Sequence, residues 1–139
     1  MTKELGIPKQ AIAGPSIDWS MLDSLAALGR PGAPDLRIRL LDAFLSSAPS
    51  LMKNLRIAVA GSDTAAIAKA AHSLKSSSMN MGATSLGTLC SQLERHGREA
   101  CLDQAAGLLA EAEDEFRLVR EAFTALLENL TKEGSQTMQ

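Results

Sequence analysis

The sequence predicts an all-α protein, an antiparallel up-down-up-down four-helix bundle with an additional short N-terminal helix. Its 139 residues suffice for one ordinary domain, and 45% of them are hydrophobic. Alanine and leucine are abundant, whereas the chain has three Phe, one Trp and no Tyr, a composition that favours helices over strands. Apolar residues recur at steps of three and four along most of the chain, which is the period of helices packed lengthwise.

The beginning of the chain shows no sustained period. Residues 1–16 mix prolines and glycines with polar residues, so we expect a flexible N-terminal arm. A short helix should follow, with Asp18 as its N-cap and its end near Leu28. We expect this segment, which carries Trp19, to lie over one end of the bundle.

A longer helix is expected from Asp35, its N-cap, to Gly61. Pro49 lies inside this helix, and proline removes a backbone donor and clashes with the preceding turn. We therefore expect a kink or a break near Ser47 to Pro49. The face expected to be buried consists of Leu36, Leu40, Phe44, Leu51, Leu55 and Ala58.

A third helix should begin after Ser62 or Asp63, either of which can serve as its N-cap, and continue to Met81. Gly82 then ends it, because glycine tolerates the left-handed conformation at a helix C-terminus.

Two further helices complete the prediction. Thr84 begins the fourth, which ends at His96-Gly97, and the fifth runs from about Leu102 to Leu130. The fourth helix has an apolar face of Leu86, Leu89, Cys90 and Leu93. The fifth has the clearest seam, made of Leu102, Ala105, Leu109, Ala112, Phe116, Val119, Phe123, Leu126 and Leu130.

Residues 17–131 are therefore expected to form a single helical domain, followed by a flexible tail of residues 132–139. The net charge is −2 and both signs are spread along the chain, so we do not expect nucleic-acid binding. No run approaches the roughly 18 apolar residues of a membrane span, and the cysteines form no C-x-x-C pair. The opening residues also lack a secretory signal, so we expect a cytoplasmic protein without direct membrane insertion.

The third helix carries a histidine on its exposed side. At 100° per residue its apolar residues fall within an arc of roughly 80°, and His72 points away from that arc. Residues 64–82 contain no Asp or Glu, whereas Lys69 and Lys75 lie three residues to either side of His72. The stripe expected to be buried consists of Ile67, Ala70, Ala71, Leu74, Ser78 and Met81.

These features suit a phosphoryl carrier. An imidazole with a pKa of about 6.5 is largely a neutral nucleophile at cellular pH. The two lysines can stabilise the negative charge of a phosphoryl group, and small neighbouring side chains leave room for a second domain to approach. An ordinary exposed histidine is the other interpretation that the spacing alone permits. The residues expected to contact a partner are Ala65, Ala68, Lys69, Ser76 and the adaptable Met79.

The segment from Ala71 to Ala83, AHSLKSSSMNMGA, is followed by Leu86, Leu89-Cys90 and Leu93-Glu94. This pattern resembles the signature of histidine-phosphotransfer (HPt) domains. It joins a His-x-Leu-Lys core to a cluster of small residues, a Gly-Ala turn and a Leu-Glu pair.

The resemblance implies that His72 carries the phosphoryl group on Nε2, that Lys75 lies beside it and that Leu74 belongs to the core. It also implies a helical bundle over residues 17–130. The position of Ser76 is most often glycine in the family, so serine is a departure. Serine is still small, and its hydroxyl can hydrogen-bond phosphoryl oxygens, but it puts the choice of partner and the transfer rate in doubt.

By the same resemblance the protein is a phosphocarrier of a two-component phosphorelay rather than an enzyme with kinase activity. It would shuttle a phosphoryl group between His72 and aspartates of receiver domains, those of a response regulator and of a sensor histidine kinase, including hybrid kinases. The chain has neither a Walker-type loop nor a kinase Gly-rich motif, so we expect no ATP binding, no autokinase activity and no cofactor of its own. The Mg²⁺ would belong to the partner receiver domain.

Other interpretations of the histidines and of the whole chain have less support in the sequence. His96 lies at a helix C-terminus, where an imidazolium interacts favourably with the helix dipole, so we expect a structural role. The spacing of the two histidines and two cysteines matches no zinc pattern, so no metal site is expected. A non-phosphorylated helical adaptor is the alternative function, and an inert bundle would have no use for the surroundings of His72. We expect a monomer, although some HPt domains dimerise through an N-terminal helix.

Overall fold

A computed structural model describes residues 16–30 and 32–137, which form α-helices joined by short connections and contain no strand. The all-α class is confirmed; the expected N-terminal arm, apart from Ser16, lies outside the described residues. Within the described part, no helix combines the length and the apolarity needed to cross a membrane. The helices are α2 (Ser20–Ala27), α3 (Leu36–Ala60), α4 (Thr64–Asn80), α5 (Thr84–Arg98) and α6 (Ala105–Thr137).

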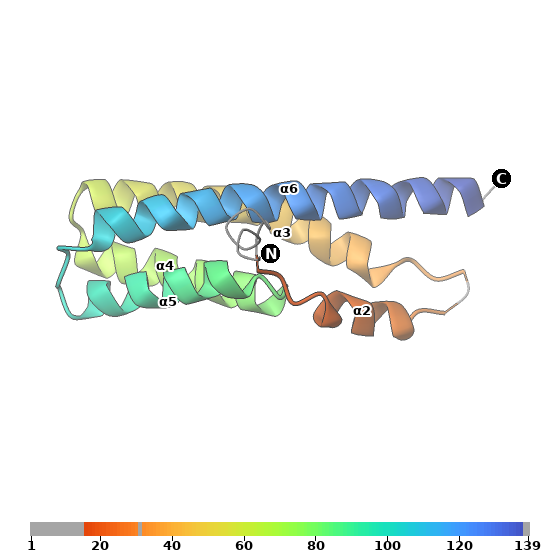
Figure 1. Ribbon diagram of the computed structural model, residues 1–139, viewed down its shortest axis with the longest axis horizontal. Helices are drawn as coiled ribbons and strands as arrows, with labels where there is room; N and C mark the ends of the chain where they lie inside the picture. Colours follow the sequence, from red (N-terminus) through yellow and green to blue (C-terminus); the bar gives the residue numbers. More distant parts are fainter. Residues whose placement is uncertain (1–15, 31, 138–139) are drawn as a thin grey trace, which may run out of the picture.

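The four longer helices pack in a closed order: α4 contacts α3 and α5, and α6 contacts α3 and α5. Figure 1 shows α3 and α6 side by side along one side of the molecule and α4 with α5 along the other. The short helix α2 packs against α3. It lies beyond the end of α4 and α5, beneath the parts of α3 and α6 that extend past them (Figure 1).

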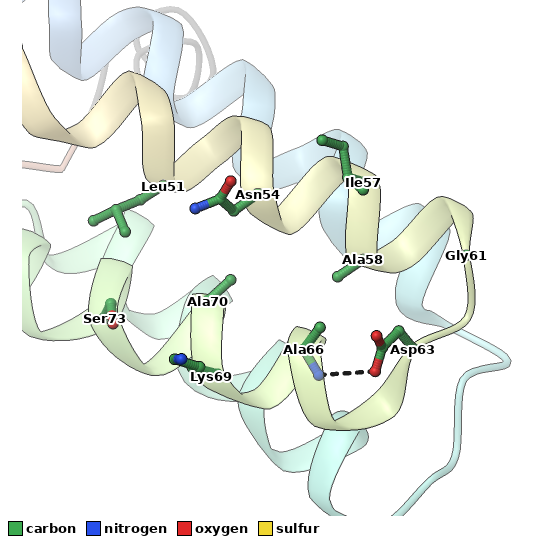
Figure 2. A pocket seen from close by; sticks show the side chains of 10 residues that line it. All are labelled: Leu51, Asn54, Ile57, Ala58, Gly61, Asp63, Ala66, Lys69, Ala70 and Ser73. Carbon is green, nitrogen blue, oxygen red and sulfur yellow. Dashed lines mark hydrogen bonds between the residues drawn. The ribbon is translucent and has the colours of Figure 1, made fainter.

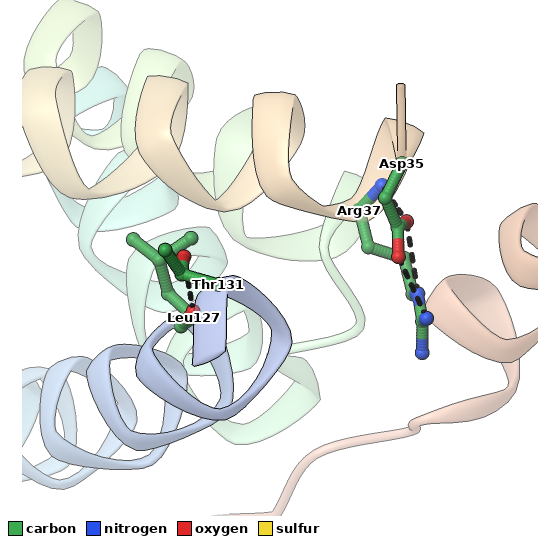
Figure 3. Close-up of polar contacts among 4 residues, drawn as sticks. All are labelled: Asp35, Arg37, Leu127 and Thr131. Carbon is green, nitrogen blue, oxygen red and sulfur yellow. Dashed lines mark hydrogen bonds and ion pairs between the residues drawn. The ribbon is translucent and has the colours of Figure 1, made fainter. Parts of the chain in front are cut away.

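The N-terminus of α3 is fixed by local chemistry, as expected. The Asp35 side chain accepts a hydrogen bond from the Arg37 backbone N–H at 2.9 Å, and the Arg37 guanidinium donates two more to the same carboxylate (Figure 3). The side-chain hydrogen bond from Arg37 holds the pKa of Asp35 below its ordinary value. Asp35 is therefore an N-cap that stays charged at neutral pH.

Of the kink or break expected near Ser47 to Pro49, the break is wrong, because α3 is continuous from Leu36 to Ala60. The residues that flank the proline on the inner face, Ala48 and Met52, are almost completely buried. Their packing outweighs the loss of one backbone hydrogen bond at the proline.

The buried face of α3 also differs from the expected one at its start. Leu36 and Leu40 are 42% and 39% exposed, whereas Leu41 is fully buried. One position along a helix is a rotation of 100°, so the helix presents a neighbouring stripe to its partners at this end. Phe44, on the buried stripe, contacts Phe123 of α6, and the two ring centroids are 5.4 Å apart. The buried residues of α3 are Leu41, Phe44, Ala48, Met52, Leu55 and Ala58.

The last helix, α6, supplies most of the aromatic core. Phe123 is fully buried and also contacts Trp19 edge-to-face at 5.8 Å, which ties the N-terminal segment to the bundle. The helix begins at Ala105 rather than Leu102 and continues to Thr137 rather than ending at Leu130. Residues 132–137 of the expected tail are therefore helical. The fully or nearly buried seam residues are Ala105, Ala112, Phe116, Val119, Phe123 and Leu130.

The turn between α4 and α5 has the left-handed glycine that the sequence predicts, since Gly82 has φ +81°. The chain before α2 crosses this turn: Ile17 forms an isolated antiparallel bridge with Ala83. The Asp18 backbone N–H donates to the Gly82 carbonyl at 2.7 Å. A Cβ on Gly82 would lie 2.2 Å from the Asp18 carbonyl oxygen, so only glycine fits beneath this segment.

Candidate functional site

Helix α4 has the two faces that its period predicts. Its start is capped by Asp63, whose side chain accepts a hydrogen bond from the Ala66 backbone N–H at 3.1 Å (Figure 2). The whole expected stripe is buried, namely Ile67, Ala70, Ala71, Leu74, Ser78 and Met81. On the other side of the helix, the His72 side chain is 57% exposed. The prediction that this imidazole faces solvent is confirmed.

A buried carboxylate lies directly beneath the histidine. Glu94 comes from α5, and its side chain is only 4% exposed. Its Oε2 lies 2.9 Å from Nδ1 of His72, and its Oε1 lies 2.8 Å from Nζ of Lys75. The Arg98 guanidinium also donates to Oε2 of Glu94. A carboxylate that would be costly to bury alone is thereby satisfied by three cationic or potentially cationic groups.

These contacts keep the Glu94 carboxylate charged. The hydrogen bond from Lys75 is the largest cause that holds the pKa of Glu94 below its ordinary value, against the opposing effect of burial, and His72 and Arg98 act in the same direction. Glu94 is therefore ionised at neutral pH, and an ionised carboxylate can only accept hydrogen bonds. Nδ1 of His72 must then carry the hydrogen, which leaves Nε2 of the neutral ring with its lone pair.

Close packing of α4 against α5 lets Glu94 reach the histidine. Gly97 lies on the same side of α5 as Glu94, one turn further on. A Cβ on Gly97 would lie 2.9 Å from both the Ala68 backbone nitrogen and the Thr64 carbonyl oxygen. The two helices therefore approach one another too closely for any side chain at this position.

A hollow of about 270 Å³ opens beside the imidazole, between α4 and α5. It is flanked by two exposed cations, Lys69 from α4 and Arg98 from α5. An anionic group attached to the ring would lie between these positive charges. The lining residues are Ala68, Lys69, His72, Ser73, Glu94 and Arg98.

A second and larger hollow, of about 520 Å³, lies between α3 and α4 (Figure 2). Lys69 and Ser73 line both hollows, so the two are neighbours on the surface. Small and apolar side chains make most of its lining, and Ile57 at its edge is 60% exposed. The remaining lining residues are Leu51, Asn54, Ala58, Gly61, Asp63, Ala66 and Ala70.

The structure brings the expected site residues together only in part. Lys75 is joined to His72 through Glu94, and Ala68 and Lys69 line the hollow with the imidazole. The other expected contact residues, Ala65, Ser76 and Met79, are exposed on α4 but line neither of the two hollows.

The second histidine has a structural contact. Nδ1 of His96 lies 3.1 Å from the Cys101 carbonyl oxygen, an acceptor, so the ring donates and ties the end of α5 to the following loop.

Burial raises the pKa of the Cys90 thiol to about 12. Within the described residues, no three His, Cys, Asp or Glu side chains are grouped as ligands for a metal ion.

Two functional candidates, Glu94 and Arg98, were missed as site residues from the sequence. A signal for Glu94 does exist, because it follows Cys90 by four residues and so shares the apolar face of its helix. A charged residue within such a face indicates a buried carboxylate that needs a partner. Nothing in the sequence identifies that partner as His72, since the two residues are 22 positions apart on different helices.

Comparisons with known proteins identify relatives of this chain. The family model described as the Hpt domain matches residues 39–135, which include α4 and α5. The chain is similar to the crystal structure of histidine-containing phosphotransfer protein B (HptB) from Pseudomonas aeruginosa PAO1, at 32% sequence identity and a TM-score of 0.75. That similarity covers 83% of this chain and 96% of the other. No curated protein matches this sequence significantly.

Proposed function

The chain belongs to the Hpt domain family and is a histidine phosphotransfer protein of a phosphorelay, and on this premise we propose that His72 is the residue that accepts and donates the phosphoryl group. One observation carries the proposal. The exposed imidazole of His72 is hydrogen-bonded through Nδ1 to the ionised Glu94, which in the neutral ring leaves the lone pair of Nε2 as the nucleophile.

In the proposed transfer, Nε2 of His72 attacks the phosphorus of an aspartyl phosphate on a receiver domain. The new N–P bond forms while the bond between phosphorus and the aspartyl oxygen breaks, and the aspartate leaves as a carboxylate with the electron pair. Positive charge develops on the imidazole, and Glu94 stabilises it through the Nδ1–H. The reverse sequence returns the phosphoryl group to an aspartate.

The cations around the ring have different roles in this proposal. Lys69 and Arg98 flank the hollow in which a phosphoryl group on Nε2 would lie, so they offset its negative charge. Lys75 acts mainly through Glu94: its ammonium group keeps that carboxylate ionised, and the carboxylate stabilises the positive charge of the phosphorylated ring. The chain brings no cofactor of its own; Mg²⁺ would be held by the receiver domain, where it neutralises charge on the phosphoryl oxygens.

We propose that receiver domains dock on the exposed face of α4. Residues 64–98 carry Lys69, Lys75, Arg95 and Arg98, while Glu94, buried among its partners, is their single acidic residue. This surplus of positive charge complements the acidic residues that hold Mg²⁺ in a receiver. The docking residues would be Ala65, Ala68, Lys69, Ser76 and Met79, and the hollow between α3 and α4 (Figure 2) would take apolar side chains of the partner.

Further parts of the proposal concern the whole molecule. The partners are the receivers of a response regulator and of a sensor histidine kinase, and the chain itself neither binds ATP nor phosphorylates itself. It acts in the cytoplasm as a monomer, with its four longer helices in the up-down-up-down order of an antiparallel bundle. The close pairings of α3, α4, α5 and α6 support that order.

The test is transfer of a radioactive phosphoryl group from a phosphorylated receiver domain in the presence of Mg²⁺. We expect a label on this protein that is labile in acid and stable in alkali, as phosphohistidine is. His72→Gln should abolish the label, whereas His96→Gln, a matched control at the other histidine, should keep it. Labelling that survives His72→Gln would refute the assignment, and receiver binding without any labelling would favour the adaptor function.

A further inference from the structure

We propose that a basic groove between α3 and α6, on the side of the bundle away from His72, binds an acidic segment of a partner protein. The groove has a volume of about 390 Å³, within the size range of ligand-binding clefts. Its lining comes only from these two helices and consists of Pro49, Met52, Lys53, Arg56, Glu113, Phe116, Arg117 and Arg120.

The groove is positively charged, whereas the chain as a whole is slightly negative. Four of its lining residues are cationic and one, Glu113, is acidic, although the net charge of the protein is −2. Glu113 is paired with Arg56. Arg117 has only a 3.6 Å contact with the exposed Glu121. Within the described residues, 16–30 and 32–137, neither Lys53 nor Arg120 forms an ion pair with a carboxylate. The described residues therefore neutralise the positive charge of the groove only in part.

The floor of the groove is apolar. Met52 and Phe116 are 1% and 7% exposed, and Pro49 is half-buried. The Arg120 guanidinium lies over the Phe116 ring, 5.6 Å from its centroid. This cation–π contact limits the positions that the guanidinium can adopt. Cations above an apolar floor suit a ligand that combines carboxylates with an apolar side chain.

The arrangement favours an extended ligand over a single small anion. The cations lie in two rows, Lys53 and Arg56 on α3 and Arg117 and Arg120 on α6. Each helix contributes about two turns to the groove, Pro49 to Arg56 on α3 and Glu113 to Arg120 on α6. At the rise of an α-helix, two turns span about 10 Å. A phosphate ion binds best where donors converge on one point, whereas spaced carboxylates of a peptide can meet cations along this length.

The position of the groove separates it from phosphoryl transfer. His72 and Glu94 lie between α4 and α5, and these helices form the pair opposite to α3 and α6 in the packing order. Figure 1 shows the two pairs on different sides of the molecule. A partner in the basic groove would therefore leave the face around His72 free for a receiver domain.

The test uses a fluorescein-labelled peptide, EELDDFEELDDL, in fluorescence anisotropy titrations with the full chain, and its uncharged counterpart QQLNNFQQLNNL. The groove variant combines Lys53→Glu with Arg120→Glu. The matched control combines Arg39→Glu with Lys132→Glu, which makes the same change in net charge at exposed positions outside the groove. Circular dichroism checks that both variants keep their helical content, and phosphoryl transfer to His72 is measured on each.

We expect the acidic peptide to bind the native protein, with an affinity that falls as salt is added, and the uncharged peptide not to bind. The groove variant should lose about tenfold or more in affinity and the control less than about twofold. Both variants should still accept a phosphoryl group, which keeps this inference independent of the proposed function. Equal loss in the two variants, no binding by the native protein, or displacement of the peptide by equimolar inorganic pyrophosphate would overturn the proposal.

Discussion

Replacing Glu94 with glutamine removes the negative charge beneath His72 while it keeps the shape of the side chain. In the native protein the ionised carboxylate accepts the Nδ1–H of His72 and so presents Nε2 as the nucleophile. A glutamine amide can instead donate to Nδ1, which favours the tautomer with its hydrogen on Nε2. We therefore expect Glu94→Gln to slow phosphoryl transfer without preventing folding.

The expected loss of transfer rate follows from the hydrogen bond between His72 and Glu94, which changes in strength during the reaction. A hydrogen bond to a charged group contributes about 1.5–3 kcal/mol. The bond between His72 and Glu94 strengthens as positive charge develops on the ring, so its loss falls largely on the transition state. Since about 1.4 kcal/mol corresponds to tenfold in rate, the variant should accept a phosphoryl group about 10 to 150 times more slowly.

The assay is rapid-quench transfer from a phosphorylated receiver, with Glu99→Gln as the matched control because Glu99 is exposed. Nitrogen-15 NMR of the imidazole provides a second measurement that does not depend on the receiver. It should show the Nδ1–H tautomer of His72 in the native protein and a shift toward Nε2–H in Glu94→Gln. A transfer rate within twofold of native, or a native ring protonated on Nε2, would refute the reasoning.

Three further outcomes are expected. Lys75→Ala removes the main group that keeps Glu94 ionised, so exchange should slow in the same assay while circular dichroism stays native; collapse of the fold would contradict this assignment. Gly97→Ala places a Cβ 2.9 Å from backbone atoms of Ala68 and Thr64, so urea unfolding should show a loss of about 1–3 kcal/mol; native stability would show that α4 and α5 can separate freely. Folding lowers the pKa of Glu94 below 4.5, so its ionised form stabilises the protein above that pH, and this contribution disappears as the pH falls through the lowered value. Urea titrations from pH 6 downward should therefore show a steeper loss for the native chain than for Glu94→Gln, and parallel curves would argue against an ionised Glu94.

The features that local chemistry decides were predictable from the sequence. Asp35 caps α3 as its position before an apolar period indicates, and Asp63 caps α4, for which the sequence had left Ser62 and Asp63 open. The two faces of α4, and with them the exposure of His72, follow from the helical period alone. The family signature points to His72, because the core of its motif lies within α4 and the turn that follows it.

The features that depend on neighbouring helices were not predictable. Burial of Leu41 in place of Leu40 is decided by what packs against the start of α3. The continuity of α3 at Pro49 is decided by tertiary packing, which the local rule for proline does not contain. The pairing of Glu94 with His72 is of the same kind, since it needs two helices at a fixed separation.

The crossing of residues 16–18 over the α4–α5 turn has a consequence for the order in which the molecule assembles. Helices α4 and α5 are joined by a short connection, so they can pair early through contacts that are near in the chain. The bridge between Ile17 and Ala83 closes a loop of more than sixty residues and requires the turn at Gly82 to be in place beforehand. We expect this crossing to form last and to open first, so that the Asp18 and Thr84 amides exchange with deuterium well before those in the middle of α4.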